Sequence, residues 1–161
     1  MNKIGIIMGS DSDLPIAEKA IEKLAEYGIN YEVHVYSAHR TPEETIRFAK
    51  EARQNGFDAL IGIAGKAAHL AGVIAANTTL PVIGVPVNSS LEGMDALLST
   101  VQMPPGIPVA TVGIDGAANA AILAAEILAV SDEKLAQLLL KKRIEAKEAV
   151  LEKNHRIEEK W

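Results

Sequence analysis

Residues 31–44 read YEVHVYSAHRTPEE and combine a strand, a loop and a helix start. The β-branched and aromatic residues at the beginning predict a strand. The TPEE sequence predicts a helix N-terminus, with Thr41 as the N-cap and a proline at the first helical position. The loop between the two elements carries His39 and Arg40. These two side chains therefore lie at the carboxyl end of a strand, where open α/β sheets bind their ligands.

The same order of strand, loop and helix recurs along the chain. Strands are expected at 4–8, 31–36, 59–64, 82–85 and 109–112, and helices are expected to end near 27, 55, 77, 101, 129 and 161. This alternation predicts the α/β class, as a three-layer α/β/α sandwich around a five-stranded parallel sheet, because parallel strands need helical crossovers that cover both faces. A flavodoxin-like strand order, 2-1-3-4-5, places the loops after the first three strands side by side.

The composition bounds the class of protein. The chain has 161 residues, which fits a single domain at 1–161, and its 48% of hydrophobic residues includes only 4% aromatic ones, as in helix-covered parallel sheets. The absence of Cys excludes disulfides and thiol chemistry. A net charge of −5 without a basic stretch before the last helix argues against nucleic acid as a partner. Because no signal-peptide or membrane-spanning run is present, we expect a soluble, cytoplasmic protein without a membrane partner.

Two helices at the end of the chain bear on subunit contacts. The helix at 117–129 is apolar almost all round, which indicates burial on more than one side and an oligomer interface. Beyond the α/β core at 1–130, residues 131–161 form a long, highly charged C-terminal helix with an apolar stripe. This stripe either folds back over the chain's own sheet or packs on a neighbouring subunit, and we expect the neighbour.

The loops after the first two strands carry the first candidate binding residues. Ser10 and Ser12 offer hydroxyls to a phosphate, and Asp13 either binds ribose hydroxyls or caps the helix that follows. His39 is a proton carrier near neutral pH, because imidazole has an unperturbed pKa of ~6.5. Arg40 is a fixed cation for a phosphate or a carboxylate. Taken alone, the loop is equally compatible with an exposed His-Arg pair that has no function.

The loop after the third strand, GKAAHLAG at 65–72, is rich in small residues that allow close backbone approach to a ligand or a subunit. It contributes His69, and a single imidazole at the start of an apolar helix is more typical of a structural role than of a chemical one. The chain has no GxxxxGK[ST] phosphate loop and no His pair at metal-ligand spacing, so we expect neither a nucleotide cofactor nor a metal.

A set of motifs in fixed order resembles the 5-(carboxyamino)imidazole ribonucleotide mutases, the PurE family of purine biosynthesis. The motifs are GSDSD at 9–13, SAHRTP at 37–42, AG at 64–65, AAHL at 67–70, the strand between prolines at 81–86, VQMP at 101–104 and NAA at 119–121. The pair His39-Arg40, with AAHL downstream, resembles the mutase branch. The branch that carboxylates aminoimidazole ribonucleotide directly with carbon dioxide typically has His-Lys at the first position.

The resemblance implies an isomerase with a ribonucleotide substrate and no metal or other cofactor. It also implies a homo-octamer with shared active sites, across which the terminal helix packs. His39 is then the general acid and base that moves a carboxyl group from an exocyclic nitrogen to ring carbon C4. The substrate-binding residues are expected to be Ser10, Ser12, Asp13, Ser37, Ala38, Arg40, Gly65, Lys66, His69 and Leu70. We assign Arg40 and the serines to the phosphate, Asp13 to the ribose and His69 to the carboxylate.

Two positions depart from the family pattern. The third loop commonly has Gly where this chain has Lys66, and Pro where it has Ala71. Lys66 either adds a cation for the phosphate or carboxylate or points to solvent. The alternatives to a mutase are a direct carboxylase and a nucleotide-binding protein without turnover. A phosphoacceptor module is disfavoured, because Ala64-Gly65 stands where the acceptor Asp would end the third strand.

Overall fold

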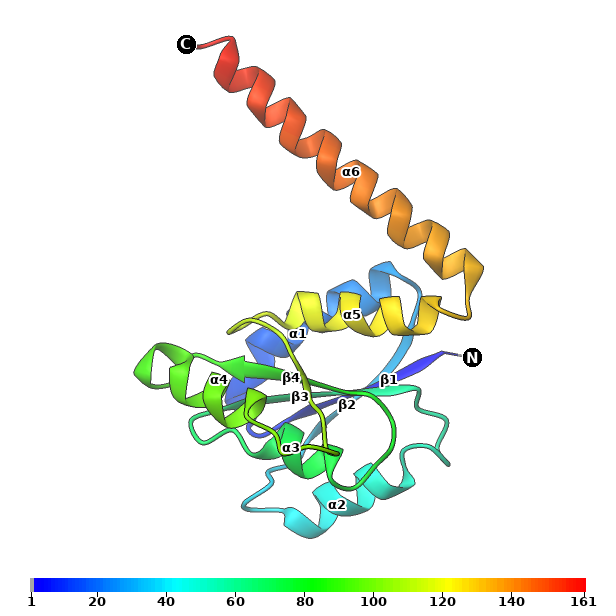
Figure 1. Cartoon of the computed structure of the whole chain (residues 1–161), viewed down its shortest axis with the longest axis vertical. Coiled ribbons are helices and arrows are strands. Elements are labelled where there is room, and N and C mark those ends of the chain that lie inside the picture. Colours follow the sequence, from blue (N-terminus) through cyan, green and yellow to red (C-terminus); the bar gives the residue numbers. More distant parts are fainter. Residues whose placement is uncertain (1) are drawn as a thin grey trace.

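The computed structural model describes residues 2–161 and contains one parallel sheet between two layers of helices (Figure 1). The strand order is β2-β1-β3-β4-β5, and every neighbouring pair is parallel. The strands are β1 (Lys3–Met8), β2 (Asn30–Val35), β3 (Ala59–Gly65), β4 (Val82–Val87) and β5 (Ala110–Thr111). The predicted α/β class, the three-layer sandwich and the flavodoxin-like order are confirmed.

Helices cover both faces of the sheet. They are η1 (Asp11–Asp13), α1 (Leu14–Glu26), α2 (Pro42–Glu51), α3 (Leu70–Ala75), η2 (Leu91–Gly93), α4 (Met94–Val101), α5 (Ala117–Ala129) and α6 (Glu133–Glu158). α1 and α5 lie on one face, and α2 and α3 lie on the other (Figure 1). α2 ends earlier than predicted, because its last expected turn is replaced by turns that lead to Gly56 at a φ of 78°. In the part of the chain described, no helix has both the length and the hydropathy to cross a bilayer.

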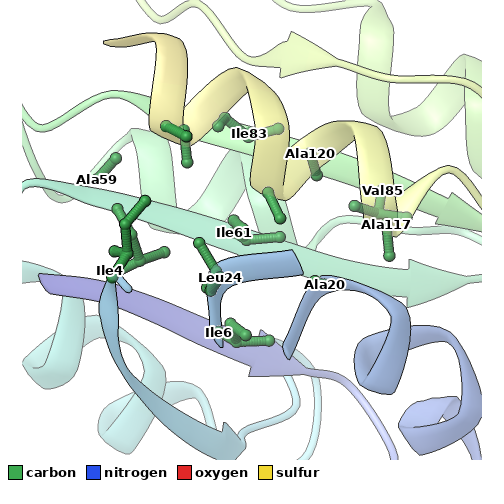
Figure 2. Packing of buried hydrophobic residues seen from close by; sticks show 14 of the residues in the cluster. Ile4, Ile6, Ala20, Leu24, Ala59, Ile61, Ile83, Val85, Ala117 and Ala120 are labelled. Atoms are coloured by element: carbon green, nitrogen blue, oxygen red, sulfur yellow. The ribbon is translucent and has the colours of Figure 1, made fainter. Parts of the chain in front are cut away.

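Branched side chains from three strands form the core beneath α1 and α5. Figure 2 shows Ile4, Ile6, Ile61 and Ile83 of the sheet together with Leu24 of α1, and none of these side chains is exposed. Burying an aliphatic side chain of this size contributes about 1.5–3 kcal/mol. Alanines on the facing sides of α1 and α5 let both helices approach the strands closely (Figure 2). The packed sheet therefore holds the ends of the loops at its edges in fixed positions.

One face of the apolar helix α5 is buried by its own chain. Its buried residues are Ala117, Ala120, Ala121, Ala124, Ala125 and Leu128. They belong to one core cluster with residues of α1, the sheet and the first turns of α6. These residues form one stripe of the helix, while Ile122, Leu123 and Ile127 on its other sides are only partly buried. The oligomer interface inferred from the sequence therefore stays a prediction.

α6 is attached to the body by its first turns. Leu135 and Leu139 are buried in the core, and Lys142 Nζ lies 2.9 Å from a carboxylate oxygen of Glu26 on α1. Further along, the helix projects away from the body (Figure 1). Apolar side chains of this part, such as Ile144, are exposed. The helix thus does not fold back over its own sheet, which was one of the two alternatives. Packing on a neighbouring subunit stays a prediction.

Candidate functional site

A cavity of about 570 Å³ opens at the carboxyl edge of the sheet, where the loops after β1, β2 and β3 meet. Every residue predicted for the site lines it: Ser10, Ser12, Asp13, Ser37, Ala38, His39, Arg40, Gly65, Lys66, His69 and Leu70. The lining also includes Gly9, Ala64, Ala67 and Ser89. The strand order thus brings loops that are far apart in the sequence into one place, as predicted for a topological switch point.

Hydrogen bonds around the loop after β2 fix Arg40. Its backbone N–H and its Nε donate to the Ser37 hydroxyl at 3.2 and 3.3 Å, and its Nη2 donates to the Gly9 carbonyl at 2.8 Å. Thr41 occupies the N-cap position of α2, but its hydroxyl accepts from the Ser37 N–H at 2.8 Å and makes no cap hydrogen bond. Thr41 is therefore the N-cap residue, as predicted, but its side chain does not cap the helix. Its hydroxyl closes the loop that presents His39 instead.

Two imidazoles from different loops meet in the cavity. His39 Nε2 lies 2.7 Å from His69 Nδ1, and the ring planes are 83° apart. A hydrogen bond at this distance needs a proton on one of the two nitrogens and a lone pair on the other. Both residues are exposed in the single chain, so His69 is not a structural imidazole buried in the core.

The loop after β1 supplies two hydroxyls and a buried carboxyl group. Ser12 Oγ donates to Ser10 Oγ at 2.9 Å. Asp13 is only 7% exposed, and burial, with a smaller contribution from the neighbouring charge of Asp11, raises the pKa of its carboxyl group. Asp13 occupies the N-cap position of α1 without a side-chain cap hydrogen bond. The capping alternative is therefore excluded, and the carboxyl group can serve the hydroxyls of a ligand.

Ser89, which the sequence analysis did not select, shapes the loop after β3. Its hydroxyl accepts from the backbone N–H of Lys66 at 3.1 Å. A Cβ at Gly65 would lie 2.3 Å from the same hydroxyl oxygen, so any other residue here would force Ser89 to move. Lys66 itself adopts a φ of 55°, in the left-handed region that favours glycine. The signal for Ser89 was the NSS sequence at 88–90, which places hydroxyls after the fourth strand at the same sheet edge.

The family described as AIR carboxylase matches residues 3–149. The chain belongs to the AIR carboxylase family. An N5-carboxyaminoimidazole ribonucleotide mutase of Methanocaldococcus jannaschii is 56% identical over 156 residues, which are 97% of this chain and 98% of that protein. A protein of the same name from Thermotoga maritima is 51% identical over 160 residues, 99% of this chain and 94% of its own. The crystal structure of a PurE2 protein of Treponema denticola superposes with a TM-score of 0.88 at 30% identity, over 96% of this chain and 97% of that chain.

Within this AIR carboxylase fold, the charges of the cavity suit an anionic ligand. Two permanent cations, Arg40 and Lys66, and one carboxyl group, Asp13, line it. Among residues 2–161, no three His, Asp or Glu side chains are placed to share a metal ion. The groups that are present can hold an anion, accept hydrogen bonds from hydroxyls and move a proton, which is the chemistry that a phosphorylated sugar with a reacting base requires.

Proposed function

We propose that this member of the AIR carboxylase family is an isomerase that converts 5-(carboxyamino)imidazole ribonucleotide into 4-carboxy-5-aminoimidazole ribonucleotide. The observation that carries the proposal is the pair of His39 and His69, with ring nitrogens 2.7 Å apart beside a fixed arginine. The reaction needs a proton donor first and a base later, and one imidazole serves as both near neutral pH. The two mutases that are similar over nearly their whole length support the same reaction.

The ribonucleotide is held by the loops after β1 and β2. Arg40 binds the phosphate, because hydrogen bonds to neighbouring groups orient its guanidinium before the ligand arrives. The hydroxyls of Ser10 and Ser12 bind further phosphate oxygens. Asp13 accepts hydrogen bonds from the ribose hydroxyls, which replace the water that this buried group lacks.

The chemistry proceeds in two steps that conserve the proton. His39 protonates the exocyclic nitrogen of the carbamate, the C–N bond breaks with its electron pair going to nitrogen, and carbon dioxide and aminoimidazole ribonucleotide form. Ring carbon C4 then attacks carbon dioxide to form the new C–C bond, and His39 removes the proton from C4. Because the proton given in the first step returns in the second, the protein's own side chains suffice for the whole sequence.

His69 acts as a positioning residue for the imidazole of His39. Its Nδ1 lies 2.7 Å from His39 Nε2, and this hydrogen bond holds the orientation of the His39 ring. The two rings meet edge to face, with planes 83° apart.

Carbon dioxide must be retained between the two steps, which calls for a closed site. Both imidazoles are exposed in the single chain. We therefore propose that neighbouring subunits cover the cavity in a cytoplasmic homo-octamer with shared active sites. The projecting half of α6, with Ile144 at 49% and Leu151 at 55% exposure, supplies apolar surface for such a contact.

An absorbance assay with the purified protein tests the proposed reaction. One mixture contains the carbamate substrate without ATP, metal or added bicarbonate, and the other contains aminoimidazole ribonucleotide with bicarbonate. We expect rapid product formation from the carbamate alone. Product from the second mixture only would identify a direct carboxylase, and no product from either would leave a nucleotide-binding protein.

A further inference from the structure

Lys66 combines a strained backbone with a place in the cavity. Its φ of 55° disfavours any residue that has a Cβ, and glycine would adopt it freely. The Ser89 hydroxyl holds the Lys66 N–H at 3.1 Å, so the surrounding structure imposes this conformation. A strained residue of this kind points to a function for its side chain, since the chain gives up stability to keep it.

The ligand of the proposed function has two anionic groups, a phosphate and a carboxylate, and the cavity has two permanent cations. Arg40 follows β2 and is bonded to Gly9 after β1. Lys66 follows β3 and is held by Ser89 after β4. In the order β2-β1-β3-β4 these are the two halves of the row of loops. The two cations therefore serve opposite ends of the ligand.

The reacting end of the ligand lies where the two halves meet, because His39 after β2 contacts His69 of the loop that contains Lys66. The same loop carries His69, whose Nδ1 contacts the Nε2 of His39, so the proton is moved beside this loop. The phosphate is already provided with Arg40 and the serine hydroxyls of the other half. We propose that Lys66 Nζ binds the migrating carboxyl group before and after its transfer, and that it makes the site select carboxylated over uncarboxylated nucleotides. This inference rests on the proposed function.

The positive charge of Lys66 acts on Asp95 in the first turn of α4. A hydrogen bond from the Ser90 hydroxyl, and more weakly the positive charge of Lys66, lower the pKa of this carboxyl group. Asp95 also accepts from the Ala96 N–H at 2.9 Å. Within residues 2–161, no salt bridge joins Lys66 to Asp95 or to another carboxylate, so its ammonium remains for a ligand.

The effect of Lys66 on KM and kcat follows from the states of the ligand in which the carboxylate carries its negative charge. A cation beside the carboxylate stabilises both carboxylated nucleotides, whereas the charge is gone once neutral carbon dioxide forms. Lys66 therefore strengthens binding without speeding the breaking of the C–N bond. Removing its charge should raise KM for the carbamate and leave kcat unchanged or higher.

Calorimetric titrations with two stable ligands test the assignment. Lys66→Met removes the charge and retains the strained backbone. We expect it to bind 4-carboxy-5-aminoimidazole ribonucleotide about 10-fold more weakly and aminoimidazole ribonucleotide with less than about 2-fold change. Lys66→Arg should keep most of the affinity because it keeps the charge. Lys50→Met, an exposed lysine of α2 outside this cavity, is the matched control and should change neither affinity.

The outcomes separate this inference from the reaction on which it rests. Equal losses for both ligands would place Lys66 on the phosphate, and no loss for either would leave it in solvent; both results overturn the inference while wild-type turnover still supports the reaction. A wild-type protein that binds neither nucleotide would overturn both. Lys66→Gly shows whether a loss of affinity comes from misfolding. It should bind as weakly as Lys66→Met and yet melt at a higher temperature, because glycine adopts this φ without strain.

Discussion

The two edges of the sheet differ in which residues hold a left-handed backbone. At the carboxyl edge, four residues other than glycine have a positive φ: Lys66, Leu91, Glu92 and Asp115. At the amino edge, within residues 2–161, the positions with a positive φ are all glycines: Gly28, Gly56 and Gly106. Turns that only connect elements use the residue that fits without strain. The strained side chains collect at the edge that carries the chemistry.

The cavities at the two edges differ as well. The one at the amino edge is the larger, about 930 Å³ against about 570 Å³, but none of the residues described around it is His, Asp or Glu. Its cations have structural roles. Lys50 lies in the last turn of α2, where the helix dipole favours a positive charge, and Arg53 donates to the Thr79 hydroxyl at 3.1 Å. The carboxyl edge, which we call the functional edge, is thus distinguished by reactive side chains that converge in its cavity and not by the volume of that cavity.

The largest effect should come from the imidazole of the functional edge. His39→Asn should lower turnover by about 1,000-fold, because the proton carrier is lost, while binding of the carboxylated product stays nearly intact. Steady-state rates and calorimetric titration measure the two quantities. His34→Asn is the matched control, since this imidazole stacks on Tyr36 outside the cavity, with ring centroids 5.3 Å apart. Loss of binding together with activity would show that His39 is structural.

Asp13 tests whether the functional edge gives up stability for binding. Asp13→Asn should weaken nucleotide binding by about 10-fold and should raise the free energy of unfolding at neutral pH. The sign follows from burial, which raises the pKa of this carboxyl group above 3.8. Wild-type stability then falls as the pH rises from 3.8 through the folded-state pKa, because the unfolded chain ionises first. Unfolding in urea at several pH values measures it.

The variant's advantage should vanish below pH 3.8, where the group is protonated in both states. An advantage that persists there would contradict the role of burial. Asp11→Asn, an exposed neighbour that does not line the cavity, is the control and should leave binding unchanged.

A reciprocal exchange of glycine tests the backbone comparison directly. Lys66→Gly should raise the free energy of unfolding by about 1 kcal/mol, and Gly56→Ala should lower it by about 1 kcal/mol. A Cβ at Gly56 would meet no atom within 4 Å, so only its φ of 78° opposes the alanine. Turnover should be unchanged in Gly56→Ala. Shifts of the same sign in the two variants, measured in urea, would break the comparison.

The smallest effect is expected away from both edges, where α6 meets α1. Hydrogen bonds from Lys23 and then Lys142 lower the pKa of Glu26 to about 2. These three solvent-accessible side chains contribute little to the stability of the fold, and their contribution is present above pH 4.5 and lost as the pH falls toward 2. Glu26→Gln should remove it without altering turnover. A change in turnover would link α6 to the active site within one chain.

Most of the fold was predictable because hydrophobic runs, helix stops and glycines follow local rules. The sequence predicted five strands, their order and the set of residues at the carboxyl edge, and the structure places that set in one cavity. Local rules failed where a side chain had a competing partner. Thr41 has the sequence of an N-cap, but its hydroxyl binds Ser37 in the preceding loop.

Contacts between distant loops were not predictable. The 2.7 Å approach of His39 and His69 depends on side-chain directions in two loops, which periodicity does not report. The hydrogen bond from the Lys66 N–H to the Ser89 hydroxyl likewise requires β3 and β4 to be paired up to Gly65 and Val87. The apolar character of α5 predicted burial on more than one side, but the single chain fully buries only one face of this helix.

The central claim is that the carboxyl group migrates within one site at the functional edge. The most direct measurement follows a carbamate substrate labelled with ¹³C in its carboxyl carbon, converted by the wild-type protein in unlabelled bicarbonate. We expect the C4 carboxylate of the product to retain the label, because carbon dioxide is held beside His39 between the two steps. A product whose carboxylate has the isotopic composition of the bicarbonate pool would contradict the account.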